Sequence, residues 1–550
     1  YISPIYPIYV RTIDANGNPV IATDRFGHPQ YDFGVPATNF QGLNGRPFSQ
    51  TGNPLGSNRY NKVNDILDQL QGQLNFDITF TPWLKFNSTN SITLILSRFS
   101  HYENPFIGNA AATNGSIDKY TDVSYRWNYV QTLNAHKVFG LHDVQLMVGH
   151  EWYKMNYNFL EALARGGFSP AIQEINAFAD RYNSYSYQRN YNVEGYFANF
   201  LYNFDQKYFA QASYRRDASS RFAKKNRWGD FWSIGGAWIV SKEKFFQNLN
   251  TKWVDNLKLK ASIGQQGNDG IPNFNYIDMY TLVRGGQSML PSFSGIGNPK
   301  ITWETTTNFN LGLEFNLFQN RLNGEFNFYN KKTTDMLFWL SVPESMGVRG
   351  YYGNLGDIRN TGVEFTLNGD IIRTKDFTFN SGLNLSFQQN KLNTLSGTYK
   401  GQALTTSEHI AVANINAAGL TQNTGVTYLI EGQPIGVFYL PHCEGINANG
   451  QYIITDLDKN GTIDTGDSGD RYVCGQAIPK AYLGWDFTFK YKNWDLAMQF
   501  NGAFGHKIYN GTGMTYSNMN NFTTYNVLAD APEKGIKDIQ ISDYWLEKGD

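Results

Sequence analysis

The residues best suited to chemistry form an acidic loop late in the chain. Positions 1, 3, 5, 7, 9 and 12 of a twelve-residue segment are Asp456, Asp458, Asn460, Thr462, Asp464 and Asp467. Carboxylate and amide oxygens at this spacing, with the carbonyl of the seventh residue, match the loop that wraps Ca²⁺. Gly461 permits a sharp turn at position 6. We therefore expect a structural Ca²⁺ that holds a long loop in place.

Two details of this loop leave an alternative open. Position 12 is Asp467, whereas EF-hands carry a bidentate Glu there. The flanking segments 451–454 and 471–473 resemble strands rather than helices. The alternative is an acidic turn around Asn460 and Gly461 that binds no metal.

The chain has two cysteines, Cys443 and Cys474, and they stand on either side of the acidic loop. A disulfide between them would close a loop of about 30 residues and add about 3 kcal/mol of stability. A location outside the cytosol would favour that bond. The alternative is two free thiols.

Signatures of enzymes are absent from the sequence. None of the eight histidines has the spacing of a zinc protease, and Ser219 and Ser220 lack the glycine context of a nucleophilic serine. The net charge of −1, from 46 basic and 47 acidic residues, shows no basic footprint for nucleic acid. We expect neither a catalytic function nor a nucleic-acid partner.

The elements that position these residues are strands, because apolar and polar residues alternate along much of the chain. The segment 324–329, G-E-F-N-F-Y, and the segment 494–504, W-D-L-A-M-Q-F-N-G-A-F, are clear examples. Such alternation gives a strand one dry face and one wet face. Further strands are predicted at 73–80, 127–139, 143–153, 193–204, 208–214, 232–240, 257–263, 306–317, 362–367, 376–387 and 485–491.

The connections between these strands alternate in length. Short polar turns are predicted at 203–207, 318–321 and 491–494. Long gaps lie around 20–65, 159–188, 265–300, 391–431 and 505–545. Short turns at one end and long loops at the other are typical of outer-membrane barrels. Residues 61–70 instead favour a short amphipathic helix or a loop turn.

Composition fits a barrel wall. Aromatic residues make up 16% of the 550 residues and charged residues only 17%, below the roughly 25% of ordinary soluble domains. The mean hydropathy is nevertheless −0.45, as expected when one face is apolar and the other polar. Tryptophans near strand ends suggest an interfacial girdle. The alternative is a large secreted all-β protein.

Several segments in order resemble the SusC/RagA family of TonB-dependent transporters. They are G-H-E-W-Y at 149–153, R-R-D-A-S-S-R-F at 215–222, N-P-K-I-T-W-E-T-T-T at 298–307, N-L-G-D-I-R-N-T-G-V-E at 354–364 and S-D-Y-W-L-E-K-G-D at 542–550. Each segment alone is a weak signal. Their order and spacing make the resemblance specific, and it covers roughly residues 70 to 550.

The resemblance implies an all-β fold, a large antiparallel transmembrane β-barrel of about 22 strands with long extracellular loops, most of whose strands lie in this chain. Such proteins span the lipid of the bacterial outer membrane and import glycans or peptides. The resemblance also implies energy from the TonB complex through a plug, a SusD-like lipoprotein lid, and, as one assembly, a dimer of transporter–lid pairs.

The sequence departs from the family pattern at both ends. It contains no N-terminal plug or TonB-contact segment, and it stops at residue 550, where the family continues into further strands. We therefore expect residues 1–550 to be a partial barrel domain within a longer protein. Residues 441–476 are expected to form an inserted extracellular loop with the calcium-type motif.

The sequence does not identify the residues that contact substrate. Aromatic pairs at Phe338-Trp339 and Tyr351-Tyr352 could stack on sugar rings or peptide groups, but packing in the girdle or the loops is the favoured interpretation. A passive porin and a secreted β-rich carbohydrate-binding or carbohydrate-degrading protein remain as alternative functions.

Overall fold

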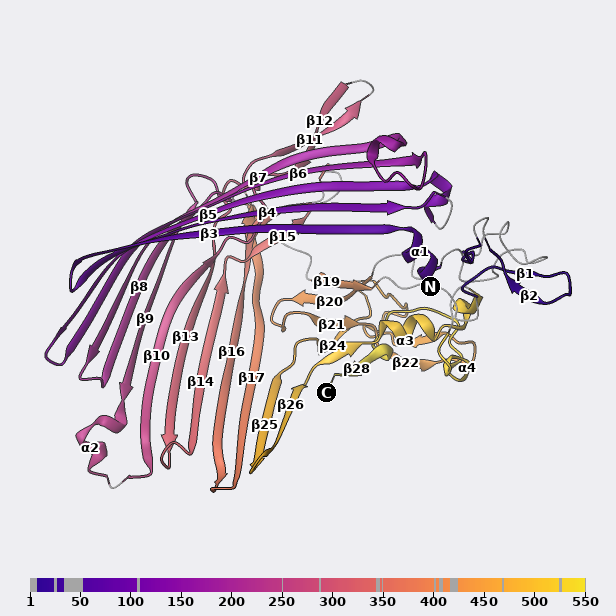
Figure 1. Ribbon diagram of the computed structural model, residues 1–550. Helices are drawn as coiled ribbons and strands as arrows, with labels where there is room; N and C mark the ends of the chain where they lie inside the picture. The colour runs from indigo at the N-terminus through magenta and orange to yellow at the C-terminus, as the bar shows by residue number, and fades with distance from the viewer. Residues whose placement is uncertain are drawn as a thin grey trace.

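A computed structural model describes residues 7–23, 27–33, 53–105, 109–249, 251–285, 288–342, 347–348, 350–399, 402–404, 409–415, 424–466, 469–523 and 527–549. Most of them belong to one antiparallel sheet, in which successive long strands pair in chain order (Figure 1). Each strand bonds to the strand before it and the strand after it, so the sheet grows without crossovers. The predicted fold class is confirmed.

Fourteen strands make the path of this main sheet. They are β3 (Lys62–Thr81), β4 (Leu84–Glu103), β5 (Ser116–Phe139), β6 (His142–Gly167), β7 (Phe178–Phe204), β8 (Tyr208–Ser219), β9 (Trp228–Ile239), β10 (Val254–Asn268), β13 (Glu304–Leu317), β14 (Leu322–Thr334), β16 (Gly350–Arg373), β17 (Phe377–Tyr399), β25 (Ala481–Tyr491) and β26 (Trp494–Phe504). Two short strands, β15 (Leu337–Ser341) and β18 (Gln402–Leu404), pair with β16 and β17.

The remaining strands form small sheets in the connections. They are β1 (Arg11–Ile13) with β2 (Pro19–Ile21), β11 (Met279–Gly285) with β12 (Ser288–Gly295), β22 (Cys443–Ile446) with β23 (Tyr452–Ile454), β27 (Lys507–Tyr509) with β28 (Leu546–Lys548), and the four strands β19 (His409–Ile415), β20 (Thr424–Ile430), β21 (Val437–Leu440) and β24 (Tyr472–Gln476).

Helices are short and lie in loops. They are α1 (Pro54–Tyr60), α2 (Lys244–Gln247), α3 (Gly511–Tyr516) and α4 (Ala531–Lys534), with 3₁₀ turns η2 (Asn109–Thr113), η3 (Ile175–Ala177), η4 (Val240–Lys242), η6 (Met519–Thr523) and η7 (Asp543–Trp545). In the part of the chain described, no helix has the length and apolar character needed to cross a membrane.

The three predicted tight turns are confirmed. Asp205 and Gln206 join β7 to β8 with φ angles of 52° and 51°, the pair of left-handed residues that a type I′ hairpin requires. Phe318, Gln319 and Asn320 between β13 and β14 also have positive φ angles. These turns gather at one end of the sheet, and the long connections leave from the other (Figure 1). The β9–β10 connection is an exception, because it carries α2 on the turn side.

Two expectations about element boundaries were wrong. Residues 61–70 are not a helix or turn, because β3 starts at Lys62 and pairs in register with β4 from Tyr102 onward. The predicted gap at 159–188 is mostly strand, since β6 continues to Gly167 and β7 begins at Phe178. In both places pairing with a long neighbouring strand outweighs the weak local pattern.

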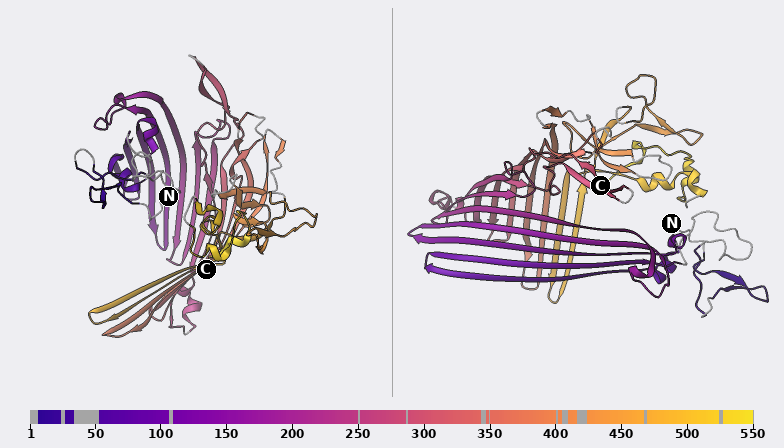
Figure 2. Two further views of the ribbon diagram at one scale, coloured as in Figure 1. Left: turned by 90° about the vertical axis from the view of Figure 1, so that its right-hand side faces the viewer. Right: turned by 90° about the horizontal axis from the view of Figure 1, so that it is seen from above.

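The two faces of the main sheet differ in polarity. Ile234, Ile263 and Phe309 form one cross-strand row and are 57%, 40% and 38% exposed. The adjacent row on the opposite face holds Ser233, Gly264 and Asn308. The sheet therefore presents an apolar outer face and a polar inner face, and it curves as a wall (Figure 2).

We expect a charge on the outer face to destabilise the folded protein, because that face suits hydrocarbon. Leu311→Lys in the intact protein should lower the free energy of unfolding by about 2–4 kcal/mol, measured by urea unfolding from phospholipid vesicles. Asn310→Lys is the matched control, because Asn310 lies on the inner face beside it. Equal losses in both variants would contradict the assignment of faces.

Candidate functional site

The inner face of the main sheet holds a hollow of about 740 Å³. Inward-facing residues of β6 to β10, β13, β14 and β16 line it. Six of them carry amide groups: Gln145, Asn203, Gln211, Asn308, Asn310 and Asn327. Amides both donate and accept hydrogen bonds, so this wall suits a ligand rich in hydroxyl or peptide groups.

An ion network crosses the wall beside this hollow. Lys260 on β10 contacts Glu314 of β13 at 2.8 Å and also Glu325 of β14. Lys258 reaches Glu314 at 3.1 Å. Glu314 and Glu325 face each other directly across the two strands, so Lys260 offsets the repulsion between them.

A second network joins two of the segments that carry the family resemblance. Arg215 of β8 contacts Glu151 of β6 at 2.7 Å and Asp217 at 2.8 Å. Its guanidinium also lies 5.3 Å from the ring centre of Phe197 on β7. Any side chain at Gly195 would collide with Arg215 and Asp217. The absence of a side chain at that position gives the network its space.

A third network fastens the loop after β10 to the end of β8. Asp269 accepts hydrogen bonds from Ser219 Oγ at 2.6 Å and from Tyr191 at 2.8 Å. The guanidinium of Arg221 lies 3.3 Å from Asp269. Ser220 Oγ accepts a hydrogen bond from the backbone of Asn192. Both serines of the 215–222 segment therefore have structural partners.

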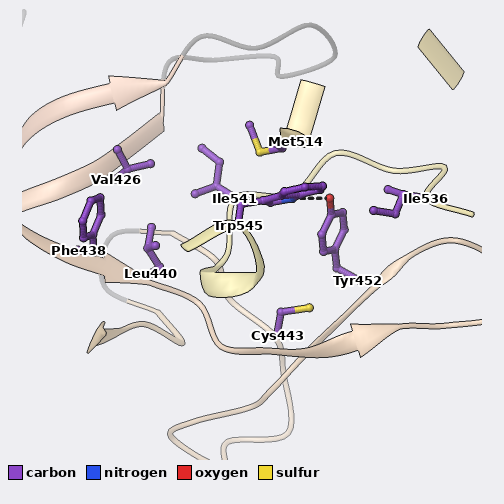
Figure 3. Close-up of a cluster of buried hydrophobic side chains, with 9 residues drawn as sticks. All are labelled: Val426, Phe438, Leu440, Cys443, Tyr452, Met514, Ile536, Ile541 and Trp545. Carbon is purple, nitrogen blue, oxygen red and sulfur yellow. Dashed lines mark hydrogen bonds between the residues drawn. The ribbon is translucent and has the colours of Figure 1, made fainter. Parts of the chain in front are cut away.

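The long connection after β17 and the residues after β26 pack into one loop unit, which comprises residues 409–415, 424–476 and 505–549 as far as they are described. Its core contains Val426, Phe438, Leu440, Cys443, Tyr452, Met514, Ile536, Ile541 and Trp545 (Figure 3). Trp545 Nε1 donates a hydrogen bond of 2.9 Å to the hydroxyl of Tyr452. Burial raises the pKa of Tyr452 to about 12.

Asp543 ties three parts of the loop unit together. Its carboxylate accepts hydrogen bonds from the backbone of Cys443 at 2.8 Å and from the hydroxyl of Tyr472 at 2.7 Å. His442 Nδ1 lies 2.7 Å from the same carboxylate. These partners are 71 to 101 residues away in sequence, so this single half-buried group holds distant segments of the loop unit together.

The acidic loop folds around a carboxylate that the sequence analysis did not select. Oxygens of Asp456, Asp458 and Asp470 all lie within 4.8 Å of one another. Asp470 is 1% exposed and accepts hydrogen bonds from the backbone of Leu457 at 2.6 Å and of Asp464 at 2.9 Å. The loop therefore wraps onto Asp470, which lies beyond its predicted end.

The other predicted ligands are arranged differently. Asp464 is not in this cluster, and its carboxylate accepts a hydrogen bond from the backbone of Gly466 at 2.8 Å. The side-chain oxygen of Asn460 accepts hydrogen bonds from the backbone and hydroxyl of Thr462. Asp467 lies outside the described residues. Asp470 lies three residues past position 12 and directly before Arg471. A carboxylate this close to the end of the loop is the sequence feature that could have indicated a further ligand.

Arg471 anchors the acidic loop to the small sheet beneath it. Its guanidinium donates hydrogen bonds to the carbonyl of Thr465 at 2.8 Å and to the hydroxyl of Tyr428 at 2.8 Å. It also reaches the carbonyl of Tyr439 at 3.2 Å. Arg471 is buried, so the end of the loop has a fixed position relative to β20 and β21.

The three converging carboxylates fit a hard cation. Ionised carboxylates this close repel one another unless a positive charge lies between them. The described ion pairs place no Lys, Arg or His on Asp456, Asp458 or Asp470. Oxygen donors of this type are those that Ca²⁺ prefers.

The expected disulfide between Cys443 and Cys474 is not present, because both are free thiols. They belong to different small sheets, β22 with β23 and β21 with β24. Cys443 Sγ donates to the carbonyl of Gly445 at 3.2 Å, and Cys474 Sγ donates to the carbonyl of Phe438 at 3.4 Å. Each thiol is thus bonded within its own sheet.

The aromatic pairs singled out from the sequence lie on β15 and β16, which pair with each other. Tyr351 is buried in a cluster with Met336, Leu340 and Leu355. Trp339 is 44% exposed, but its ring meets Tyr352 edge-on at 5.1 Å. This arrangement agrees with the packing interpretation.

Comparison with known proteins gives a consistent pattern. The family described as "TonB dependent receptor-like, beta-barrel" matches residues 11–502. TonB-dependent receptor P3 of Formosa agariphila is 28% identical over 76% of this chain and 43% of its own length. TonB-dependent receptor P26 of the same organism is 30% identical over 75% of this chain and 42% of its own length.

Two further similarities extend this pattern. TonB-dependent receptor SusC of Bacteroides thetaiotaomicron is 28% identical over 76% of this chain and 40% of its own length. This chain thus spans less than half the length of these curated relatives. A solved structure of the RagAB peptide transporter superposes with a TM-score of 0.79 at 22% identity, over 95% of this chain and 57% of that chain. That likeness supports the fold.

Free thiols in this environment should react slowly with alkylating reagents. Burial raises the pKa of Cys474 to about 12 and also raises the pKa of Cys443, so both remain protonated at neutral pH, and only thiolates react quickly. Mass spectrometry after iodoacetamide treatment should find both cysteines unmodified in the folded protein at pH 7.5 and both modified after unfolding without reductant.

The unfolded, unreduced sample also tests the pairing itself. Modification of both cysteines requires two free thiols, whereas resistance until a reductant is added would indicate a disulfide. In the folded protein, the rate of modification should rise as the pH increases towards 9, because the thiolate fraction grows.

Proposed function

Since the chain belongs to the TonB dependent receptor-like β-barrel family, is of the SusC/RagA type and lies in the bacterial outer membrane, we propose that it forms most of the barrel wall of an energy-driven importer of a large nutrient. The observation that carries this proposal is the polar inner face with its amide-lined hollow of about 740 Å³. A barrel that moves polar cargo needs a wet inner face of this kind.

The arrangement of connections supplies the orientation of the proposed importer. Outer-membrane barrels keep short turns on the periplasmic side and long loops outside the cell. The turns at Asp205-Gln206 and Phe318–Asn320 then face the periplasm. The loop unit and the β11–β12 hairpin face the exterior, where incoming nutrients arrive.

The energy source and the partners of the importer are proposed from its family. We propose that the TonB complex drives transport through a plug in the complete protein. We also propose that a SusD-like lipoprotein caps the extracellular mouth, and that transporter–lid pairs associate as dimers. The similarity to a TonB-dependent receptor named SusC supports the dependence on TonB, and the structural likeness to the RagAB transporter supports a partner of this kind. The cargo is a glycan or a peptide, and the amide-lined hollow suits both.

We propose further that the loop unit holds a structural Ca²⁺ at Asp456, Asp458 and Asp470, with Asn460 and Thr462 beside it. The support is the close approach of three carboxylates within 4.8 Å and the calcium-type spacing of the loop. The positive charge of the ion would offset the repulsion between the three carboxylates. Asp470 is buried next to Arg471, which bonds to the carbonyl of Thr465, so the ion would tie the acidic loop to this fixed end.

Transport should depend on the protein and on an energised membrane. Cells that carry the intact gene should accumulate labelled oligosaccharides or peptides from a complex mixture, and cells that lack it should not. A protonophore or loss of TonB should abolish the difference. Uptake that persists without TonB would indicate a passive pore, and absence of any gene-dependent uptake would contradict import altogether.

Removal of Ca²⁺ should loosen the acidic loop. EGTA should accelerate protease cleavage within residues 441–476 of the intact protein by roughly tenfold, because ligand binding stabilises only the folded loop. Asp470→Asn should have the same effect without chelator. Asp464→Asn is the matched variant, and it should change cleavage less, because Asp464 lies outside the cluster. Cleavage that is insensitive to EGTA would contradict the site.

A further inference from the structure

The outer face of β14, β16 and β17 changes in character from the turn end of the strands to the loop end. These strands are neighbours in the main sheet (Figure 1). Direct cross-strand pairing sorts their outward side chains into rows, which are two apolar rows followed by one uncharged polar row. From the turn side, the rows are Phe326, Phe365 and Leu385, then Phe328, Val363 and Phe387, then Asn330, Thr361 and Gln389.

The next row towards the loops consists of three cations, and we call it the basic row. Lys332 pairs directly with Arg359 across β14 and β16, and Arg359 pairs directly with Lys391 across β16 and β17. No register shift separates this row from the apolar rows, so the three side chains face outward, and all three residues are exposed. Because paired strands lie about 4.8 Å apart, three positive charges gather within roughly 10 Å.

The basic row carries an excess of positive charge. Like charges directly opposite each other on paired strands destabilise a sheet. Lys332 contacts Asp357 at 3.1 Å, but within the described part of the chain Arg359 and Lys391 form no ion pair within 4.0 Å. Arg359 Nε instead donates to the neutral side-chain oxygen of Asn330 at 2.9 Å. An anion beside Arg359 and Lys391 would remove the repulsion.

Other arginines on the outer face have acidic partners within the chain. Arg98 of β4 contacts Asp68 of β3 at 2.6 Å, and Arg216 of β8 lies 3.6 Å from Asp230 of β9. The basic row differs from these pairs because two of its three cations have no carboxylate. Its counter-charge would therefore come from outside the chain.

The basic row lies at the loop-side border of the surface that meets lipid. On β17 the outward residues from Phe379 to Phe387 are apolar apart from Ser381. That span matches the roughly 9–11 tilted residues with which a strand crosses a bilayer. Lys391 lies four residues beyond Phe387. With the long loops outside the cell, this position is the headgroup level of the outer leaflet.

We propose that Lys332, Arg359 and Lys391 bind the phosphate groups of lipid A, the phosphorylated anchor of lipopolysaccharide in the outer leaflet. This inference rests on the orientation given under the proposed function and adds a lipid-binding site to the outside of the wall. Arginine binds phosphate through paired N–H groups, and lysine binds it as a point charge. Clusters of such residues next to an apolar surface are typical sites for anionic lipid headgroups.

The occupant is a lipid rather than a soluble anion because the basic row continues the lipid-facing surface without a break. Acyl chains would cover the two apolar rows while the phosphate groups reach the cations. Between them lie Asn330, Thr361 and Gln389, whose side chains donate and accept hydrogen bonds. They stand at the level of the sugar and amide groups that join the acyl chains of lipid A to its phosphates.

The test is lipid binding by the intact transporter in detergent, measured by native mass spectrometry. The probes are bisphosphorylated lipid A and the same lipid after removal of its phosphates. We expect the phosphorylated lipid to bind at least about tenfold more tightly, because each lysine or arginine near an anionic lipid surface contributes to binding. Lys332→Gln/Arg359→Gln/Lys391→Gln should remove most of that preference.

Lys375→Gln/Lys490→Gln/Lys492→Gln is the matched control variant. It removes the same charge from exposed positions at the turn ends of β16, β17 and β25, on the opposite side of the membrane. It should retain the preference for phosphate, and heat-modifiable gel migration should report both variants as folded. Equal binding of the two lipids to the wild-type protein, or an equal loss of preference in both variants, overturns the inference.

Two further probes identify the source of the phosphate. Inorganic phosphate at the same concentration should not displace lipid A, because it has no acyl chains to cover the apolar rows. Displacement would show a site for soluble anions and overturn the lipid as occupant. Phosphatidylglycerol should bind less tightly than lipid A. Tighter binding of phosphatidylglycerol would assign the basic row to the inner leaflet and overturn both the inference and the orientation.

The TonB-dependent uptake assay separates this inference from the import function. The variant of the basic row should retain uptake, because its three residues point away from the hollow. If uptake persists while lipid A shows no preference for the wild-type protein, the lipid site fails and the import function stands. If lipid A binds as expected but no energised uptake occurs, the import function fails and the lipid site stands.

Discussion

The structure depends on one constraint, which is that each strand obtains its backbone hydrogen bonds from its neighbours in the sheet. Hydrocarbon offers no donors or acceptors to an exposed backbone, so a membrane wall of strands must be a continuous ladder. The unbroken register between β13 and β14, from Thr305 opposite Thr334 to Leu317 opposite Leu322, is such a ladder. The side chains then determine which face of the sheet meets lipid and which face meets water.

The ladder also decides which charges meet. Glu314 and Glu325 are opposite each other because the register places them there, and Lys260 on the next strand compensates both. Arg215 on β8 likewise compensates the negative charges of Asp217 on its own strand and of Glu151 on β6, two strands away. These clusters give the charged residues of segments 149–153 and 215–222 a structural role, since one network requires contributions from several strands.

The fold could be predicted from the sequence wherever apolar and polar residues alternate. Segments such as 494–504 and 306–317 show apolar and polar residues in strict turn, and they form the expected strands. Residues 61–70 lack this alternation. They form a strand because they pair with β4, and no local pattern in their own sequence indicates that pairing. The part of β7 before Val193 was missed for the same reason, because its strand state comes from pairing with β6.

The candidate sites were harder to predict because they are made by contacts distant in sequence. Spacing identified Asp456 and Asp458 correctly as neighbours, but the third carboxylate is Asp470, which the anchoring of Arg471 to Tyr428 brings back to the loop. Cys443 and Cys474 flank the loop in sequence yet belong to separate sheets. Linear proximity carried no information about which strands those cysteines would occupy.

The unequal strand lengths give the main sheet an uneven edge on the side of the long connections. β8 and β9 have 12 residues each, whereas β7 beside them has 27. β16 and β17 are long again, with 24 and 23 residues, so the short strands lie between two groups of long ones. Under the proposed import function, a nutrient that approaches over the short strands would meet the inner face of the long strands first. Capture would then begin on a protein surface above the membrane, and the target that a diffusing nutrient meets would be wider than the pore itself.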